Sequence, residues 1–251
     1  TVLKGKLKVL LVKRKDHPFI HDWAMPGGFV NFDEDLDTAM KRELEEETNL
    51  FDSTYFRQLY TFGNADRDPR TRVITTVYLS MTPAENIKMT SAGDDAMDTG
   101  WFTIQKITTT SDGYERKSVL MLDEEEKGIH LRYEIYDTAC DNYVQTRSKL
   151  LESSNAKLAA DHIKAINMAI DVVRNRAAST GIMFNLLPKE CTLREIQEVY
   201  EAIVNHPVDT GNIRRDIKKM LVATGSTTIV NGRKVATYSF NPLLPFVKET
   251  L

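Results

Sequence analysis

The fold of this chain is decided by residues 28–50, which read GFVNFDEDLDTAMKRELEEETNL. Residues 36–47 are strong helix formers, and their apolar members are spaced so that they fall on one helical face. These apolar members are Leu36, Ala39, Met40 and Leu44. The preceding residues 25–28, Met-Pro-Gly-Gly, break any regular element, because proline fixes its own φ and glycine adopts backbone angles that a Cβ atom forbids. The sequence therefore predicts a tight loop that leads into an amphipathic helix.

Three glutamates on this helix, Glu43, Glu46 and Glu47, project onto adjacent parts of one surface because they are three or four residues apart. Like charges at this spacing repel each other, which favours a cation between them, and carboxylate oxygens suit Mg²⁺. Arg42 lies four residues before Glu46 and can orient that carboxylate through an ion pair. Taken alone, such a glutamate-rich run is more often a solvated acidic helix face.

The surrounding residues favour the metal site over that alternative. Gly28, Glu34 and the run from Arg42 to Leu50 resemble the Nudix box, G-x5-E-x7-R-E-U-x-E-E-x-G-U, where U is apolar. The one departure is Asn49, where the family has glycine. Asparagine also tolerates a positive φ, so we expect the helix to keep a left-handed cap there.

The resemblance implies a loop–helix–loop in an α/β/α sandwich with a mixed sheet, which hydrolyses a nucleoside diphosphate linked to another group. By motif position, Glu43, Glu46 and Glu47 would hold Mg²⁺ or Mn²⁺, with the Gly27 carbonyl as a further ligand. Arg42 and Glu34 would brace the helix. The three glutamates and Arg42 form the expected catalytic set. Such a site fits pyrophosphate cleavage, which needs cations to neutralise phosphate charge and to activate water.

A second segment bears on the substrate. Residues 67–74, Arg-Asp-Pro-Arg-Thr-Arg-Val-Ile, resemble the stretch that follows the box in ADP-ribose pyrophosphatase-like Nudix proteins. Arg67, Arg70 and Arg72, together with Gly28, would then contact phosphate or ribose oxygens, since guanidinium groups bind them in a bidentate manner. The alternative is a charged hairpin loop before a strand over residues 73–79, with Arg72 paired to a nearby aspartate.

Further family resemblance lies in residues 92–96, Ala-Gly-Asp-Asp-Ala, and in the Trp101-Phe102 strand, where we expect Trp101 to be a core residue. Several relatives take the general base from outside the box, and Asp112, Glu115 or an acid within residues 123–126 can serve here. Residues 118–136 read as an extra hairpin that either caps the site or joins two subunits.

Composition limits the class of protein. The 251 residues are 41% hydrophobic and 27% charged, with a net charge of -3, which is ordinary for one large or two average globular domains. No apolar run approaches the ~18–20 residues that cross a bilayer, and the N-terminus lacks the order of a signal peptide, so we expect a cytoplasmic protein without a membrane partner. The two cysteines, Cys140 and Cys191, form no metal or disulfide pattern.

Charge divides the chain in two. Residues 1–155 carry a net charge of -7, whereas residues 156–251 carry +4. The basic part opens with one predicted amphipathic helix over residues 156–177. Within it, the adjacent Asp161 and His162 suggest either a general base or, more plausibly, a paired structural histidine. Residues 181–188 are the predicted domain boundary.

The last third of the chain predicts a winged helix-turn-helix. Thr192 and Glu195 form a capping box that opens a helix through Ile203, and a second helix starts at Asp209 or Thr210 and ends at Gly225. A hairpin follows, and its Asn231-Gly232 pair suits a type I′ turn. In such a fold the second helix enters the DNA major groove. The residues expected to contact DNA are Asn212, Arg214, Arg215, Lys218, Lys219, Arg233 and Lys234.

Residues 187–188, 192–203 and 212–215 resemble the C-terminal domain of Nudix-related transcriptional regulators, which join a ligand-sensing Nudix domain to a winged helix. The wing segment, residues 231–236, departs from the run that the family favours. The resemblance implies a Nudix domain over residues 1–180 and a winged-helix domain over residues 185–251.

Three readings stay open at this stage. The chain is a Mg²⁺-dependent hydrolase of ADP-ribose or a related nucleotide, a nucleotide-sensing repressor that binds double-stranded DNA, or a protein whose winged helix only mediates dimerisation. A palindromic DNA site would favour a homodimer.

Overall fold

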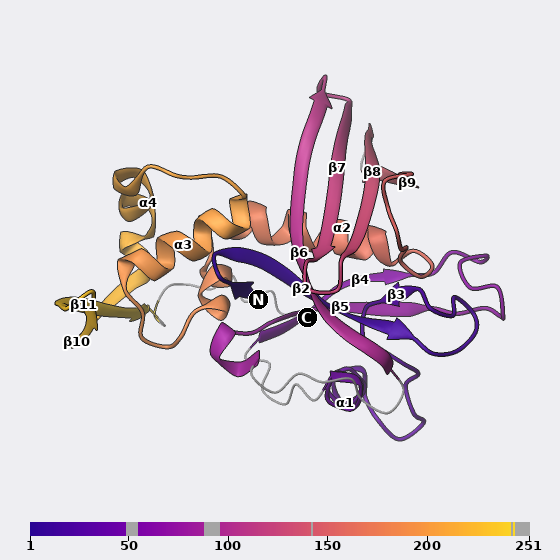
Figure 1. Cartoon of the computed structure of the whole chain (residues 1–251), viewed down its shortest axis with the longest axis horizontal. Helices are drawn as coiled ribbons and strands as arrows, with labels where there is room; N and C mark the ends of the chain where they lie inside the picture. The colour runs from indigo at the N-terminus through magenta and orange to yellow at the C-terminus, as the bar shows by residue number, and fades with distance from the viewer. Residues whose placement is uncertain (49–54, 88–95, 142, 242, 244–251) are drawn as a thin grey trace.

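A computed structural model describes residues 1–48, 55–87, 96–141, 143–241 and 243 of the chain (Figure 1). The N-terminal part contains nine strands, two α-helices and two short 3-10 helices within these ranges. They are β1 (Val2–Leu3), β2 (Lys6–Arg14), β3 (Trp23–Ala24), α1 (Leu36–Thr48), β4 (Tyr55–Phe62), β5 (Thr75–Met81), η1 (Ala84–Ile87), β6 (Ala96–Ser111), β7 (Glu115–Glu124), β8 (Ile129–Cys140), β9 (Tyr143–Leu150), α2 (His162–Arg176) and η2 (Gly181–Leu186). The helix expected from the acidic segment is therefore present as α1.

The main sheet has the strand order β1-β2-β6-β7-β8-β9, and β3 pairs with β2. Each of these pairs is antiparallel, and the parallel component of the described sheet is an isolated bridge between Trp23 and Leu158. β4 and β5 form a separate antiparallel hairpin. The hairpin predicted over residues 118–136 is part of β7 and β8, which extend beyond it, and β8 also pairs with β9.

The hydrophobic core continues from the sheet into the C-terminal helices. Trp23 and Phe102, both almost fully buried, meet edge to face with their ring centroids 4.8 Å apart. The same cluster of buried side chains includes Ile196, Ile203 and Ile217 from the C-terminal part. Burial of this apolar surface, which is the main driving force of folding, therefore holds the two parts together.

The prediction that a helix starts at Ala156 is wrong, because α2 begins at His162. Leu158 instead bridges to Trp23, and the backbone of Ala159 donates a 2.8 Å hydrogen bond to the Trp23 carbonyl. Ala160 then has a φ of 45°, which a right-handed helix cannot include. Pairing with β3 thus overrides the helical spacing of these residues.

The C-terminal part contains α3 (Leu193–Val204), α4 (Thr210–Ile217), η3 (Lys218–Met220), β10 (Leu221–Val230) and β11 (Arg233–Phe240). The capping box is present, since the Thr192 side chain accepts from the Glu195 backbone while the Glu195 carboxylate accepts from the Thr192 backbone. At the start of α4, the Asp209 side chain accepts from the Asn212 amide at 2.8 Å. Asn231 and Gly232 both have a positive φ at the two-residue turn between β10 and β11, as a type I′ turn requires.

The prediction that the second helix ends at Gly225 is wrong. α4 ends at Ile217, and residues 221–230 form strand β10, in which Gly225 has a φ of +76°. The register with β11 shifts between Ala223 and Thr227, so this glycine lies at an irregularity in the strand. The valine, threonine and isoleucine residues of this run favour a strand once β11 is available as a partner.

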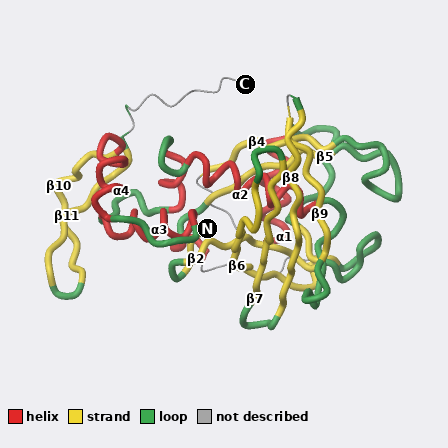
Figure 2. The backbone as a smooth tube through the Cα atoms, turned by 90° about the horizontal axis from the view of Figure 1, so that it is seen from above, coloured by secondary structure: helices red, strands yellow, loops and turns green. Residues whose placement is uncertain are grey.

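The view from above shows α4 and the β10–β11 hairpin at one end of the molecule and the β4–β5 hairpin at the other (Figure 2). α2 and α3 lie between them. Within the part of the chain that the structure describes, no helix is both long and apolar enough to cross a membrane.

Candidate ligand site and DNA-binding surface

Arg42 of α1 is the centre of an ion-pair network beside the predicted loop. Its guanidinium holds Glu34 through two hydrogen bonds of 2.6 and 3.0 Å. The same side chain donates to Glu43 at 2.7 Å, to Glu46 at 3.1 Å and to the Phe29 carbonyl at 3.1 Å. The hydrogen bond from Arg42 lowers the pKa of Glu34 to about 2. Arg42 and Glu34 therefore connect the loop to the helix in the way the family pattern implies.

The two glycines of this loop approach the acidic face of α1 directly. The Gly27 amide donates to Glu47 at 2.9 Å. A Cβ atom at Gly28 would lie only 2.3 Å from the Glu43 carboxylate. A larger residue at position 28 would therefore displace the carboxylate end of the flexible Glu43 side chain.

The proposed metal ligands Glu43, Glu46, Glu47 and Gly27 all lie around this loop. Their oxygen donors have the hard character that Mg²⁺ and Mn²⁺ prefer. However, no three acidic, histidine or cysteine side chains converge on one point within the described ranges. Arg42 engages two of the carboxylates, and Glu47 faces the amide of Gly27. The donor set therefore fits a divalent cation by its chemistry, whereas the carboxylates must exchange internal partners to surround one.

A cavity of about 620 Å³ opens beside the loop and is lined by α1, the β4–β5 hairpin and α2. Its polar lining includes Gly27, Gly28, Glu43, Arg67, Asp68 and Arg70. Its apolar lining includes Leu79, Trp101, Ile166 and Ile170. The volume and the mixed lining suit a small molecule with both charged and apolar portions.

Arg67, predicted to bind substrate, has partners within the protein. Its guanidinium forms two hydrogen bonds with Asp161, of 2.7 and 3.1 Å, and a third with the Thr75 hydroxyl at 2.5 Å. The side chain is only 8% exposed. This arginine therefore connects the loop between β4 and β5 to the start of α2.

Arg70 and Arg72 are exposed on the same loop. Arg70 pairs with Asp68 at 2.9 and 3.0 Å, and this hydrogen bonding lowers the pKa of Asp68 to about 2. Arg72, for which an aspartate partner was the alternative, instead donates to the Gly63 carbonyl at 2.5 Å. Of these two arginines, Arg70 lines the cavity.

His162 is a structural residue, as the sequence favoured, but its partner is not Asp161. The Met25 amide donates to His162 Nδ1 at 2.9 Å. Burial lowers the pKa of His162 to about 4, so the ring is neutral and can accept this hydrogen bond. His162 therefore fixes the start of the loop of residues 25–28 against α2.

The candidate general bases lie away from this cavity. Asp112 accepts from the Tyr114 and Glu115 amides in the turn at the end of β6 and β7 farthest from α1 (Figure 1). Asp123 pairs with His130 and Arg132, and neither it nor residues 124–126 line the cavity. The hairpin thus does not line this cavity within the chain, and its role in capping a site or joining subunits stays a prediction.

Trp101, expected in the core, is half-buried and lines the cavity, whereas its neighbour Phe102 is completely buried. Asn49 and residues 92–95 lie outside the described residues. Sequence reasoning missed Asp161 as the partner of Arg67, because no local spacing connects residues 94 positions apart.

The predicted DNA-binding residues form an exposed surface on α4, η3 and the β10–β11 turn. All seven are exposed, while Ile213 and Ile217 on the opposite side of α4 are buried. Arg215 lies 3.6 Å from Asp216. No other ion pair or side-chain hydrogen bond engages the six cations of this surface within the described part of the chain. We call Arg214, Arg215, Lys218, Lys219, Arg233 and Lys234 the basic face.

Each of the two parts of the chain matches a known protein family. Residues 1–122 match the NUDIX domain family, and residues 183–240 match the NrtR DNA-binding winged helix domain. The chain is therefore a Nudix-domain protein with a C-terminal winged-helix domain. More particularly, it is a homologue of the NrtR repressors and, over its N-terminal part, of ADP-ribose pyrophosphatases.

Individual relatives agree with this assignment. The chain is 26% identical over 244 residues to the "ADPR responsive transcriptional repressor NtrR" of Acinetobacter baylyi, covering 96% of this chain and 78% of that protein. An ADP-ribose pyrophosphatase of Methanocaldococcus jannaschii is 36% identical over 115 residues, 46% of this chain and 66% of that protein.

Two solved structures extend over nearly the whole chain. The structure of Shewanella oneidensis NrtR in complex with a 27mer DNA has a TM-score of 0.64 at 25% identity, covering 96% of this chain and 90% of that one. A MutT/nudix family protein from Enterococcus faecalis has a TM-score of 0.68 at 27% identity, covering 94% and 80%. These similarities cover both the Nudix and winged-helix parts.

Proposed function

We propose that this protein is a transcriptional regulator that binds double-stranded DNA through its winged helix and ADP-ribose, or a closely related nucleotide, through its Nudix domain. The observation that carries the proposal is the basic face: six cations at one end of the molecule, on α4, η3 and the wing turn, exposed above a buried apolar stripe. Phosphate contacts require such exposed cations, and α4 is the helix that would enter the major groove. The winged-helix relatives named above support the same assignment.

The residues that line the large cavity support the proposal that its ligand is a nucleotide. Arg70, the backbone of Gly27 and Gly28, and the exchangeable pairs around Arg42 provide charged and polar groups at the phosphate end. The apolar part of the cavity can cover the less polar portion of the ligand. A relative described as responsive to ADPR makes ADP-ribose the first ligand to test.

DNA binding is tested with a labelled duplex from the region upstream of the protein's own gene, by fluorescence anisotropy between ~50 and ~200 mM salt. We expect salt-dependent binding, and we expect Arg214→Ala to weaken it roughly tenfold and to lower the salt slope by about 1. Lys164→Ala is the matched control, because Lys164 is an exposed cation on α2, outside the basic face. Equal losses in both variants, or no binding at low salt, would refute this part of the proposal.

Ligand binding is tested by titration calorimetry with ADP-ribose. We expect Gly28→Ala to weaken binding, since its Cβ atom would displace the Glu43 carboxylate beside the cavity. Gly63→Ala is the control, because a Cβ atom there meets no atom within 4 Å. A Gly28→Ala protein that binds ADP-ribose as the wild type does would place the ligand elsewhere.

Hydrolysis of the ligand is a second candidate function, favoured by the complete set of Arg42, Glu43, Glu46 and Glu47 on α1. When bound there, Mg²⁺ or Mn²⁺ would neutralise phosphate charge and activate water. Glu43, Glu46 and Glu47 would hold the cation, and Arg42 would orient Glu46. The test is AMP release from ADP-ribose in the presence of Mg²⁺. We expect Glu46→Gln to slow it by orders of magnitude, and equal rates in both proteins would exclude this site.

Two further features belong to the proposal. Domain limits of 1–180 and 185–251 assign α2 to the Nudix domain and α3 to the winged helix. A homodimer would match the two-fold symmetry of a palindromic DNA site.

A further inference from the structure

α2 contacts the ligand site at one end and the DNA-binding domain at the other. Its first residue, His162, accepts the Met25 amide hydrogen bond that fixes the loop of residues 25–28. Asp161, just before the helix, holds Arg67 of the β4–β5 loop. Both loops line the large cavity. A ligand that moves either loop therefore acts directly on the first turn of α2.

Arg174, in the last turn of α2, makes the contact at the other end. Its Nε donates to the Ile203 carbonyl in the last turn of α3 at 2.9 Å. Its Nη1 donates to the Lys106 carbonyl of β6 at 3.1 Å. One side chain thus connects the helix, the Nudix sheet and the winged helix.

The Ile203 carbonyl is a favourable place for this contact. The last four carbonyls of a helix lack partners within the helix, and the helix dipole makes that end attractive to a cation. Ile203 itself is completely buried. Two residues earlier, the Glu201 carboxylate accepts from the Val208 amide at 3.1 Å, in the turn that leads to α4. A shift of the C-terminal end of α3 would therefore also move the turn that leads to α4, the helix that carries part of the basic face.

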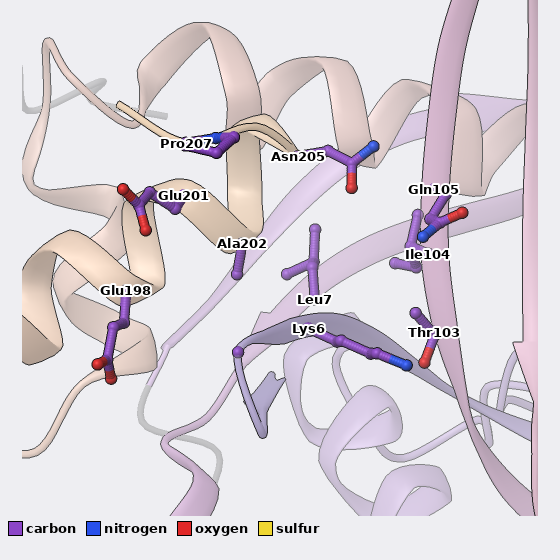
Figure 3. Close-up of a pocket in the computed structure, with 11 residues that line it drawn as sticks. Lys6, Leu7, Thr103, Ile104, Gln105, Glu198, Glu201, Ala202, Asn205 and Pro207 are labelled. Atoms are coloured by element: carbon purple, nitrogen blue, oxygen red, sulfur yellow. The ribbon is translucent and has the colours of Figure 1, made fainter. Parts of the chain in front are cut away.

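Near this contact, the interface between the two domains is incompletely filled. A cavity of about 290 Å³ lies between β2 and β6 on one side and α3 with its following turn on the other (Figure 3). Gln105 and Ala202, which line it, are the sequence neighbours of the two residues whose carbonyls Arg174 joins. Direct packing between the domains is interrupted at this cavity, so the hydrogen bonds of Arg174 contribute to the relative orientation of the domains there.

A charged network fixes α2 to the sheet one turn before Arg174. Asp171 pairs with Lys106 at 2.6 Å and with Arg116 at 3.1 Å, and Arg116 also pairs with Asp137 at 2.6 Å. Lys106 is almost fully buried, and burial lowers its pKa. Lys106 therefore makes two contacts with α2. Its side chain pairs with Asp171, and its backbone carbonyl accepts from Arg174, so this part of α2 is held firmly against β6.

We infer that α2 transmits ligand occupancy from the Nudix cavity to the winged helix, and that Arg174 is the positioning residue at its far end. This inference rests on the proposed function, because it concerns the coupling between the two proposed ligands. The distance is short: from His162 to Arg174 the helix rises about 18 Å at ~1.5 Å per residue. A coupling of this kind is measured as the change that one ligand causes in the affinity for the other.

The experiment measures the dissociation constant of the labelled upstream duplex with and without saturating ADP-ribose, and the ADP-ribose dissociation constant by calorimetry. In the wild type we expect ADP-ribose to change the DNA dissociation constant roughly tenfold. Arg174→Met removes both hydrogen-bond donors. The ratio of the DNA dissociation constants with and without ADP-ribose should therefore approach 1, while the ADP-ribose dissociation constant stays within about twofold of the wild-type value. Arg174→Lys keeps the positive charge but lacks the two separate guanidinium donors, so it should give an intermediate ratio.

Lys164→Met is the matched control, since it removes an exposed cation from the same helix and should keep the wild-type ratio. If Arg174→Met does not fold, Arg174→Lys decides the question. A ratio in the Arg174 variants equal to that of the wild type, with both ligands binding, overturns the inference alone. A wild-type protein that takes up no ADP-ribose overturns the proposed function and the inference with it.

Discussion

The charged side chains of the Nudix part and those of the basic face are arranged in opposite ways. Around the cavity, Arg42 pairs with Glu34, Arg67 with Asp161, and Arg70 with Asp68. On the basic face, cations such as Arg214 and Lys218 are exposed at the end of the molecule. A ligand that contacts these arginines must therefore exchange partners with the protein, whereas DNA can contact five of the six cations of the basic face without breaking an internal ion pair, Arg215 being the exception.

This difference has a consequence for energetics. An internal pair contributes to the folded state, and its charges are already desolvated in part. An exposed cation without an internal partner contributes little to folding, so it is available for long-range attraction to phosphate. The comparison therefore predicts that charge removal from the Nudix part lowers stability, while charge removal from the basic face does not.

The largest effect is expected for Arg67→Met. Asp161, whose side chain is only 17% exposed, would be left without its main cation. Removing one partner of a buried pair costs about 4 kcal/mol of unfolding free energy. Urea denaturation measures this loss. In the double variant with Asp161→Asn, much of the stability should return, and a single-variant loss below ~1 kcal/mol would show that the pair is not part of the folding energetics.

The next effect is a pH dependence caused by His162. Its pKa is about 4 in the folded protein, chiefly because of burial, with Arg14 and Arg67 adding to the shift and Asp161 opposing it. In the unfolded chain the ordinary value is ~6.5, so the unfolded state binds more protons between pH 4 and pH 6.5. Stability should therefore fall by up to about 3 kcal/mol as the pH drops through this range.

The control for this prediction is His162→Gln, whose amide oxygen can accept from Met25 but does not titrate. Its unfolding free energy should change less between pH 6.5 and pH 4 than that of the wild type. Identical pH profiles in the two proteins would assign the acid sensitivity to other groups.

The elements that could be predicted from sequence are those governed by neighbouring residues. The capping box of Thr192 and Glu195, the Asn231-Gly232 turn and helix α1 depend on interactions within a few positions, and the structure has all three. Because these signals are short-range, they do not depend on how the domains pack.

The errors arose where a distant partner decides the structure. Leu158 has helical spacing, yet it pairs with Trp23, which lies far from it in sequence. At Arg67 the motif did not reveal Asp161 as the partner, and phosphate binding by this arginine stays a prediction. At Gly225 the sequence suggested a helix end, but the pairing of β10 with β11 makes the residue part of a strand. Local pattern cannot reveal such partners.

A smaller effect is expected at the start of α3, where stability comes from backbone capping. Thr192 is 2% exposed, and its hydroxyl accepts from the Glu195 amide at 3.2 Å. Thr192→Ala removes the cap and should lower the unfolding free energy by about 1 kcal/mol, as measured in urea. Thr192→Ser keeps the hydroxyl and should stay closer to the wild type. Equal losses in both variants would point to the missing methyl group instead of the cap.

The smallest effect on stability is expected for the double variant Arg214→Ala and Arg215→Ala. It tests directly whether the exposed cations of the basic face contribute less to folding than the paired charges of the Nudix part. The backbones of both residues belong to α4, in which alanine is the best helix former, and only Arg215 has a nearby acid, at 3.6 Å. Exposed substitutions of this kind stay within about 0.5 kcal/mol of the wild type. Urea denaturation should therefore give overlapping curves, while DNA affinity falls in anisotropy. If the double variant instead unfolds as readily as Arg67→Met, the basic face is part of the folded architecture, and the contrast between paired and available charge does not hold.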